Sequence, residues 1–273
     1  MKTCVVKVGG DVLEDAEERE GLAFNVRDLI DDGFRVVLLH GGGPQVNRLQ
    51  EKVGLKPNKV GGRRITGADD LLVVEQAICG EVNVGLVSTL LGAGINAFGC
   101  HGASGRLVSA KKRPPRVVSG AGPEPIDFGE VGDVDKINHE LLEGLLALGL
   151  IPVIATLGVD ESGRVFNINA DTTVVAIAKA LKPDLLLLVT KVGGIFKDLD
   201  DPQSRIADVN AEQARALIAD GTIQGGMIPK VEEAMSVLDA GVGAIAIAGA
   251  AQLGAFRAVA NGGGDFGTRI SKG

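Results

Sequence analysis

The chain has 273 residues, 45% of them hydrophobic, and a formal net charge of −7 at pH 7, which predicts a folded acidic globular protein. The sequence contains no basic stripe, which excludes the usual electrostatic footprint of nucleic-acid binding. The apolar stretch at its start is too short to be expected to act as a signal peptide, and its most extended apolar region, 241–256, is interrupted by glycines. We therefore expect a cytoplasmic protein with no membrane association.

Aromatic residues make up only 3% of the chain, with no Trp and no Tyr, so the core must be built from Val, Leu, Ile and Ala. Such a core suits a parallel sheet that is buried on both faces. The three cysteines, Cys4, Cys79 and Cys100, lie far apart and are expected to be small buried thiols in a reducing compartment. The densest basic run, residues 111–113, is predicted to be a solvated hairpin.

Strands and helices alternate along the first half of the chain. The predicted strands are 4–8, 35–40, 95–101 and 151–156, and the predicted helices are 17–32, 44–53, 69–91 and 138–148. Two turn-rich segments, 55–66 and 102–132, are expected to form hairpins. This order of elements predicts parallel strand pairing with right-handed crossovers.

The second half repeats this rhythm. Its predicted elements are helices at 171–180, 211–219 and 227–239, strands at 185–190 and 244–248, and a last strand at 267–271 that closes the edge of the sheet. Because no polar linker marks a boundary, we expect two lobes, 1–160 and 161–273, that share one continuous sheet and divide near 158–167. The fold class is α/β.

Several common phosphate and metal motifs do not occur. A Walker P-loop needs the dipeptide Gly-Lys, which is found nowhere in the chain. The dinucleotide fingerprint is missing after the first strand, because Gly9-Gly10 is followed by Asp11-Val12-Leu13. The sequence has no HExxH, and its three histidines are scattered, so a zinc hydrolase has no support.

Two glycine-rich turns follow predicted strands. Lys7 stands near the end of the first strand, before Gly9-Gly10, where α/β sheets bind ligands. The alternative is an exposed strand-end lysine beside an ordinary turn. The second turn, residues 41–43, precedes a helix that starts at Pro44. Consecutive N–H groups there can form a concave anion site at the positive end of the helix dipole.

Three further motifs carry polar or charged side chains at the ends of elements. Asn167 and Asn169 alternate onto one face before Asp171, which is either a helix-terminal acid or a carboxylate that holds lysines in place. Lys230 lies in the first turn of a helix after Gly226, where a cation suggests a bound anion; an exposed helix lysine is the alternative. Arg64 can bind a carboxylate through a bidentate pair of hydrogen bonds, or it can belong to a solvated hairpin.

Together these motifs are the parts needed to transfer phosphate to an acid. The strings KVGG, HGGGPQ, R-x-T, NINAD and GGMIPK occur in this order between Thr3 and about Ile270. They closely resemble the amino-acid kinase family, and in particular its N-acetyl-L-glutamate kinases. The resemblance implies a three-layer αβα sandwich with a mainly parallel open sheet. It assigns acyl-amino-acid binding and dimerisation to lobe 1–160 and ATP binding to lobe 161–273.

The resemblance also assigns roles to individual residues. Lys7 and Lys230 would stabilise charge on the transferring phosphoryl group, and Asp171 would hold both lysines. Backbone N–H groups of Gly10, Gly42 and Gly43 would surround the phosphoryl group and the substrate. Arg64 and Asn167 would hold the α-carboxylate, with Asn169 beside them. The nucleotide would lie on Gly9, Gly10, Thr190, Lys191, Gly193, Gly194, Ile195 and Gly226.

The implied reaction moves the γ-phosphate of ATP, with Mg²⁺, to the side-chain carboxylate of N-acetyl-L-glutamate, a step in arginine biosynthesis. The acceptor is already ionised at neutral pH, so no general base is required, and no protein metal site is expected. Alternatives are a kinase of the same fold for an acyl-aminoadipate, carbamate or a nucleotide, or a catalytically silent regulatory subunit. Arg64 and Asn167 favour an amino-acid carboxylate over a nucleoside phosphate.

The sequence departs from the family pattern at several positions, chiefly on the nucleotide side. Lys191 stands where an acidic residue is usual, Val84 where a lysine is common, and Gly249-Ala250-Ala251 where Asp-Gly-Arg is frequent; 100–104 also differs. We interpret Lys191 as a solvated residue in preference to a phosphate contact.

Only three residues precede the first strand, so we expect a plain homodimer without arginine regulation through an N-terminal helix. A PII-type regulator is left open.

Overall fold

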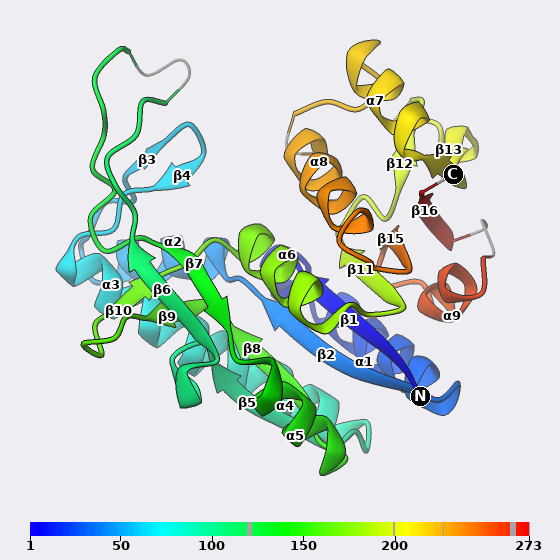
Figure 1. Cartoon of the computed structure of the whole chain (residues 1–273), viewed down its shortest axis with the longest axis horizontal. Coiled ribbons are helices and arrows are strands. Elements are labelled where there is room, and N and C mark those ends of the chain that lie inside the picture. The colour runs from blue at the N-terminus through cyan, green and yellow to red at the C-terminus, as the bar shows by residue number, and fades with distance from the viewer. Residues whose placement is uncertain (119–121, 199, 226, 263–265, 273) are drawn as a thin grey trace.

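The computed structural model describes residues 1–118, 122–198, 200–225, 227–262 and 266–272, except for the side chains of residues 229, 230, 233 and 234. Eight strands form the central sheet (Figure 1), in the spatial order β14 (Asp208–Asn210), β16 (Gly267–Ser271), β15 (Ala244–Ala248), β11 (Leu185–Val189), β1 (Lys2–Val8), β2 (Phe34–His40), β8 (Ile151–Ala155) and β5 (Ala97–His101). Only the β15–β16 pair is antiparallel among these described strands. The predicted mainly parallel sheet is therefore confirmed.

Helices cover both faces of this sheet. Helices α1 (Ala16–Asp31), α4 (Val84–Gly92) and α9 (Ala255–Ala260) pack on one face, and α5 (His139–Ala147), α6 (Ala170–Leu181), α7 (Ala211–Ala219) and α8 (Met227–Leu238) pack on the other. Successive side chains of a strand point to opposite faces of the sheet. In β1, Cys4, Val6 and Val8 therefore pack in the core under α1, α4 and α9, and Val5 packs in the core on the opposite face. The result is the predicted three-layer αβα sandwich.

Smaller elements surround the carboxyl ends of β1 and β2. On one side lie the hairpin β3 (Lys59–Val60) and β4 (Arg63–Arg64) and a four-stranded sheet of β10 (Val165–Asn167), β9 (Leu157–Val159), β6 (Val108–Lys112) and β7 (Gly132–Ile137). On the other side lie α7, α8 and the pair β12 (Ile195–Phe196) and β13 (Arg205–Ile206) (Figure 1). Both hairpins predicted in the first half are confirmed.

One long helix runs from residue 68 to residue 92. It consists of α3 (Ala68–Glu75), a π-helical segment η2 (Gln76–Asn83) and α4, and the sequence predicts the helix but not its π-helical part. By length and mean hydropathy, 1.4, it is apolar enough to cross a membrane. In this fold, however, one side of it packs into the protein through Val74, Ile78 and Leu86.

Two local predictions need correction. Residues 267–271 do not form the sheet edge, because the short strand β14 pairs with β16 and takes that position. In the basic run, Lys111 and Lys112 are exposed, but Arg113 is buried. The cysteines follow the prediction more closely, with Cys4 and Cys100 buried and Cys79 half-buried, and burial raises the pKa of all three thiols.

The sheet takes four strands from residues 1–160 and four from residues 161–273. Hydrogen-bonded pairing of β1 with β11 joins the two sets across the middle of the sheet, from Cys4 with Leu185 to Val8 with Val189. Helix α6 belongs to the later part of the chain but packs against Val5 and Val37 of the earlier part. The division into two lobes near 158–167 stays a prediction.

The glycine of α1 gives a test of this packing. A Cβ on Gly21 would lie 2.4 Å from the Ala250 carbonyl oxygen, so Gly21→Ala is expected to lower the free energy of unfolding by about 1–3 kcal/mol. Gly144→Ala in α5, where a Cβ meets nothing within 4 Å, should instead stabilise by about 0.5–1 kcal/mol. Urea unfolding of both variants measures the difference, and two effects of the same sign would contradict the described contact.

Candidate active site

The carboxyl ends of β1 and β2 bring two glycine turns together. Val8 of β1 pairs with His40 of β2, so the turn at Gly9-Gly10 lies beside the turn that begins at Gly41. A Cβ on Gly10 would be 3.0 Å from Gly42 Cα and 3.1 Å from Gly43 N. The two backbones approach this closely only because residue 10 has no side chain.

Lys7 lies next to these turns and is almost fully buried. It shares its face of β1 with Val5, and α6 covers that face, so Lys7 meets the first turn of α6. Its Nζ lies 2.8 Å from Oδ1 of Asp171. A buried ammonium is costly unless it is paired, which accounts for a carboxylate at this position.

Asn169, not Asp171, caps α6. Its side-chain oxygen accepts hydrogen bonds from the N–H groups of Asp171 and Thr172 at 2.9 and 3.0 Å. Asp171 is therefore an acid of the first turn of α6, as one of the two interpretations expects, and not its N-cap. Its carboxylate also pairs with Lys7, as the other interpretation expects.

The glycine turns present unpaired N–H donors. Gly42 is the N-cap of α2 (Gly43–Lys52), and Gly43 is the first residue of that helix, at the positive end of its dipole. Within the described residues, neither Gly10 N–H nor Gly42 N–H donates a hydrogen bond. Gln45, which is buried, donates from Nε2 to the Gly10 carbonyl oxygen at 2.8 Å and so fixes the first turn against α2.

These turns open into a cavity of about 270 Å³, here named the cationic cavity. Five of its lining side chains are cationic and none is acidic: Lys7, Lys59, Arg63, Arg64 and Arg113. The other lining residues include Gly10, Gly41, Gly42, Gly43, Thr156, Asn167 and Asn169. Such a cavity can bind a small molecule that carries more than one negative charge.

Arg64 is held in the cationic cavity by neutral partners. Its guanidinium donates to the side-chain oxygens of Gln50 and Asn47 and, at 3.4 Å, to the Gly43 carbonyl oxygen. In the described part of the chain, no carboxylate forms an ion pair with Arg64. Burial lowers the pKa of Arg64, partly offset by Asp70, but an arginine stays charged. The side chain can thus receive a carboxylate from a ligand.

Asn167 and Thr66 link the hairpin to β10. Asn167 Nδ2 donates to Thr66 Oγ1 at 3.1 Å, and Thr66 is fully buried. This bond orients the Asn167 amide at the wall of the cationic cavity. Thr66 was not among the predicted site residues, although it is the threonine of the R-x-T string that begins at Arg64.

A second cavity, of about 640 Å³, lies between β12, α8 and the end of β11. Of the predicted nucleotide residues, Thr190, Lys191, Gly194 and Ile195 line it, together with Asp11, Phe196, Lys197 and Met227. Gly193 is not among the lining residues. Its N–H donates to Thr190 Oγ1 at 3.1 Å, and its φ of 72° favours glycine. Lys191 is exposed at this cavity.

Some predicted residues have other placements. Gly10 lines the cationic cavity and not the second one, and Gly9 lines neither. Gly9 N–H donates to the Val189 carbonyl oxygen at 3.3 Å, which ties β1 to β11. Gly226 and the side chain of Lys230 lie outside the part of the chain that the structure describes.

Arg113 is the main cavity residue that sequence reasoning missed. Its Nε and Nη2 both donate to Asp133 Oδ1, at 2.9 and 2.7 Å, and its guanidinium lies 6.0 Å from the centre of the Phe128 ring. No sequence signal separates it from its exposed neighbours Lys111 and Lys112. Its burial depends on Asp133 and Phe128, which come later in the chain.

Comparison with known proteins identifies relatives of this arrangement. A model of the amino acid kinase family matches residues 2–249. An acetylglutamate kinase of Anaeromyxobacter sp. (strain Fw109-5) is 47% identical over 249 residues, which are 91% of this chain and 92% of that protein. One from Methanopyrus kandleri is 45% identical over 237 residues, 87% of this chain and 91% of that protein.

Solved structures share the fold. The crystal structure of smu.665 from Streptococcus mutans UA159 superposes with a TM-score of 0.76 at 28% identity and 99% coverage of both chains. A carbamate kinase from Giardia superposes with a TM-score of 0.70 over 100% of this chain and 99% of that one. At 19% identity, the Giardia structure supports the fold alone.

His40 makes stability depend on pH. Burial lowers its pKa from 6.5 to about 4, so the folded protein binds this proton less readily than the unfolded chain does. Above pH 6.5 the full contribution of neutral His40 to the free energy of unfolding is present. As pH falls from 6.5 towards 4, the free energy of unfolding decreases by up to about 3 kcal/mol. Urea unfolding between pH 4 and 7 should therefore show a weaker pH dependence for His40→Gln than for the wild type.

The matched control for this prediction is His139→Gln, since His139 is exposed on α5. Its free energy of unfolding should follow the wild-type curve throughout the same pH range. Parallel curves for His40→Gln and the wild type would contradict the assignment of this pH dependence to His40.

Proposed function

Because the chain belongs to the amino acid kinase family, we propose that it transfers the γ-phosphoryl group of ATP to the side-chain carboxylate of N-acetyl-L-glutamate, a step in arginine biosynthesis. One observation carries the proposal. A buried Lys7, paired with Asp171, meets two glycine turns in a cavity whose five charged lining residues are all cations. The names of relatives at 45–47% identity point to the same substrate.

The substrate suits the cationic cavity because it carries two carboxylates. We place the α-carboxylate on Arg64 and Asn167, whose side chains are already oriented by neutral partners. The side-chain carboxylate then faces Lys7 and the N–H groups of Gly10, Gly42 and Gly43. Asn169 would lie beside it. Two anchored ends restrict the orientation of the substrate, which lowers the entropic cost of reaching the reactive geometry.

The chemistry asks for positioning and charge stabilisation more than for proton transfer. The acceptor carboxylate is ionised at neutral pH, so no general base is needed. Lys7 and the glycine N–H groups supply fixed positive dipoles and charge where negative charge develops on the phosphoryl group. Asp171 forms an ion pair with Lys7 and so holds its side chain at the cavity. Lys230, in α8, is proposed as the second lysine of the transition state.

We place the nucleotide in the second cavity, on Thr190, Lys191, Gly194 and Ile195, which line it. The family resemblance adds Gly9, Gly193 and Gly226 to the proposed nucleotide contacts. Mg²⁺ would come with the phosphates of ATP, since no cluster of three potential protein ligands occurs among the described residues. Asp11, which lines this cavity, can supply one carboxylate to such an ion. When bound, Mg²⁺ neutralises phosphate charge.

Other acids of the same chemistry are weaker candidates. Carbamate has a single carboxylate and leaves Arg64 or Lys7 without a ligand, whereas an acyl-aminoadipate differs by one methylene and fills both. A hydrophobic or size-based pocket separates such homologues by only about 1–3 kcal/mol. Carbamate is therefore expected to be a much poorer substrate than either acyl-amino acid.

Turnover in variants of the two lysines tests the mechanism. Loss of one group that stabilises the transition state typically costs about 10²–10³ in rate, so Lys7→Ala and Lys230→Ala should each lose about that factor in kcat. The measurement is coupled ADP release with N-acetyl-L-glutamate, glutamate, an acyl-aminoadipate and carbamate. Wild-type protein should favour N-acetyl-L-glutamate, and both variants should keep the wild-type fold by circular dichroism.

Lys111→Ala is the matched control, because Lys111 is an exposed lysine paired with Asp135 outside both cavities. Its turnover should equal that of the wild type. Near-normal turnover in Lys7→Ala or Lys230→Ala would remove that lysine from the mechanism, and wild-type protein inactive on N-acetyl-L-glutamate would defeat the proposed substrate.

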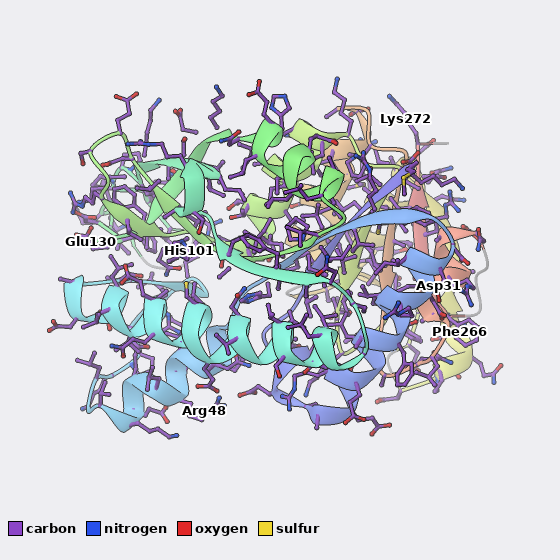
Figure 2. The ribbon with its side chains drawn as sticks, turned by 90° about the horizontal axis from the view of Figure 1, so that it is seen from below. Asp31, Arg48, His101, Glu130, Phe266 and Lys272 are labelled. Atoms are coloured by element: carbon purple, nitrogen blue, oxygen red, sulfur yellow. The ribbon has the colours of Figure 1, made fainter. Side chains whose placement is uncertain are left out.

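We further propose a cytoplasmic homodimer that forms through the β5 edge of the sheet and the long helix. Among the described strands, β5 pairs only with β8. Beside it, Val84 and Leu91 are 63% and 52% exposed, seven residues apart on one side of α4. Figure 2 looks onto this helix, which runs across the surface between the strand that carries His101 and α2, marked by Arg48. A second copy would cover this apolar surface.

Charge placed on this surface should separate the subunits. Val84→Glu combined with Leu91→Glu is expected to convert a particle of twice 28.0 kDa into one of 28.0 kDa, measured by light scattering with size-exclusion chromatography. Leu148→Glu, at another exposed leucine at the end of α5, should remain dimeric. A monomeric wild type, a hexamer, or a double variant that stays dimeric would contradict the proposed interface.

A further inference from the structure

His40 is a fully buried histidine directly before the second glycine turn, and the proposed reaction gives it no role. Its Nδ1 lies 2.8 Å from the Gly41 carbonyl oxygen, and its Nε2 lies 2.9 Å from the Asn83 side-chain nitrogen. A carbonyl oxygen only accepts hydrogen bonds, so Nδ1 carries the proton. Nε2 is then an acceptor for the Asn83 amide, and the ring is neutral in a single tautomer.

Asn83 is itself held firmly. Its Nδ2 also donates to the Val153 carbonyl oxygen of β8 at 2.9 Å, so both of its amide hydrogens have acceptors. Its side chain rests on β5 at Gly99, where a Cβ would lie 2.5 Å from Asn83 Oδ1. The absence of a side chain at residue 99 is therefore what allows Asn83 to reach His40.

The π-helical segment η2 contacts both His40 and the second glycine turn. Asn83 is the last residue of this segment, and Ile78, within it, contacts the turn itself: a Cβ on Gly42 would lie 2.8 Å from Ile78 Cγ2. π-Helical turns are rare and are frequent at functional sites. Here the π-helical part of the long helix coincides with the stretch that packs against Gly42.

The Gly41–Gly42 peptide connects the hydrogen bond of His40 to the cationic cavity. A trans peptide is planar, and its C=O and N–H groups point in opposite directions. Since His40 fixes the Gly41 carbonyl on the protein side, the Gly42 N–H must point away from it. Gly42 lines the cationic cavity, and its N–H has no acceptor among the described residues.

We propose that His40 and Asn83 form a positioning pair that fixes the direction of the Gly42 N–H towards the transferring phosphoryl group. The inference rests on the proposed kinase function for its consequence in the reaction, but not for its geometry. Neither side chain lines the cationic cavity, so the pair acts through the backbone. Burial keeps the pKa of His40 low and thus preserves the neutral tautomer at physiological pH.

Kinetics of four variants test the pair. His40→Leu and Asn83→Leu should lower kcat at least about tenfold, approaching the roughly 10²–10³ expected for loss of one donor, with KM for ATP and for N-acetyl-L-glutamate within about twofold of wild type. His40→Gln should recover most of kcat, because its amide can donate to Gly41 and accept from Asn83. Asn83→Ala provides the same test if His40→Leu does not fold.

Asn25→Leu is the matched control. Asn25 is a fully buried asparagine that bonds to the Gly21 and Ala250 carbonyl oxygens, away from the glycine turn. Its loss should lower Tm without lowering kcat by more than about twofold. The proposed role of His40 and Asn83 is overturned if His40→Leu and Asn83→Leu keep kcat within twofold of wild type. It is also overturned if kcat falls equally in Asn25→Leu at a similar Tm.

Nuclear magnetic resonance separates this inference from the proposed function. The chain has three histidines, so long-range ¹H–¹⁵N spectra with a His40→Gln reference assign the His40 ring. We expect protonated Nδ1, unprotonated Nε2 and a displaced Gly42 amide resonance in Asn83→Leu. A His40 ring protonated at Nε2, or an unchanged Gly42 resonance, overturns the pair even in an active enzyme. Absence of turnover in the wild type would instead overturn the proposed function alone.

Discussion

The ion pair between Lys7 and Asp171 is the interaction on which the rest of the site depends. It joins the central strand of the sheet to the first turn of α6 over a distance of 2.8 Å and places a positive charge at the carboxyl end of the sheet. A buried charge of this kind adds little net stability, because desolvation offsets most of the attraction. Its presence is better explained by chemistry than by folding. The pair fixes an ammonium group beside two glycine turns, in which the N–H groups of Gly10 and Gly42 have no acceptor among the described residues.

The two cavities are lined mainly by different halves of the chain. The first half supplies most of the cationic cavity, through the glycine turns, the β3–β4 hairpin and Arg113. The second half supplies the lining of the second cavity apart from Asp11, around the end of β11 and the start of α8. In the proposed placement, acceptor and nucleotide meet near Lys7, because β1 and β11 are neighbours in one sheet. Phosphoryl transfer between them needs alignment and charge stabilisation, which rigid strand ends provide.

Much of the fold followed from the sequence because its signals are local. Apolar strands, helix periodicity and glycine turns placed nearly all elements of the central sheet, and motif order located Lys7, Asp171, Arg64 and Asn167 in advance. What the sequence could not show depends on contacts between distant residues. Arg113 is buried by Asp133 and Phe128, and His40 meets Asn83, which lies 43 residues later at the end of a π-helical segment. Neither arrangement leaves a periodic pattern. Lys191, where the family pattern changes, lies exposed at the second cavity.

The proposed reaction is phosphorylation of the side-chain carboxylate of a substrate that is held between Arg64 and Lys7. Trapping of the product with hydroxylamine measures this most directly, because an acyl phosphate reacts to give a hydroxamate and a phosphate ester does not. With ATP and N-acetyl-L-glutamate, the wild-type protein should form the hydroxamate in step with ADP, and Lys7→Ala should form almost none. ADP release without hydroxamate, or equal hydroxamate from Lys7→Ala, would contradict the account.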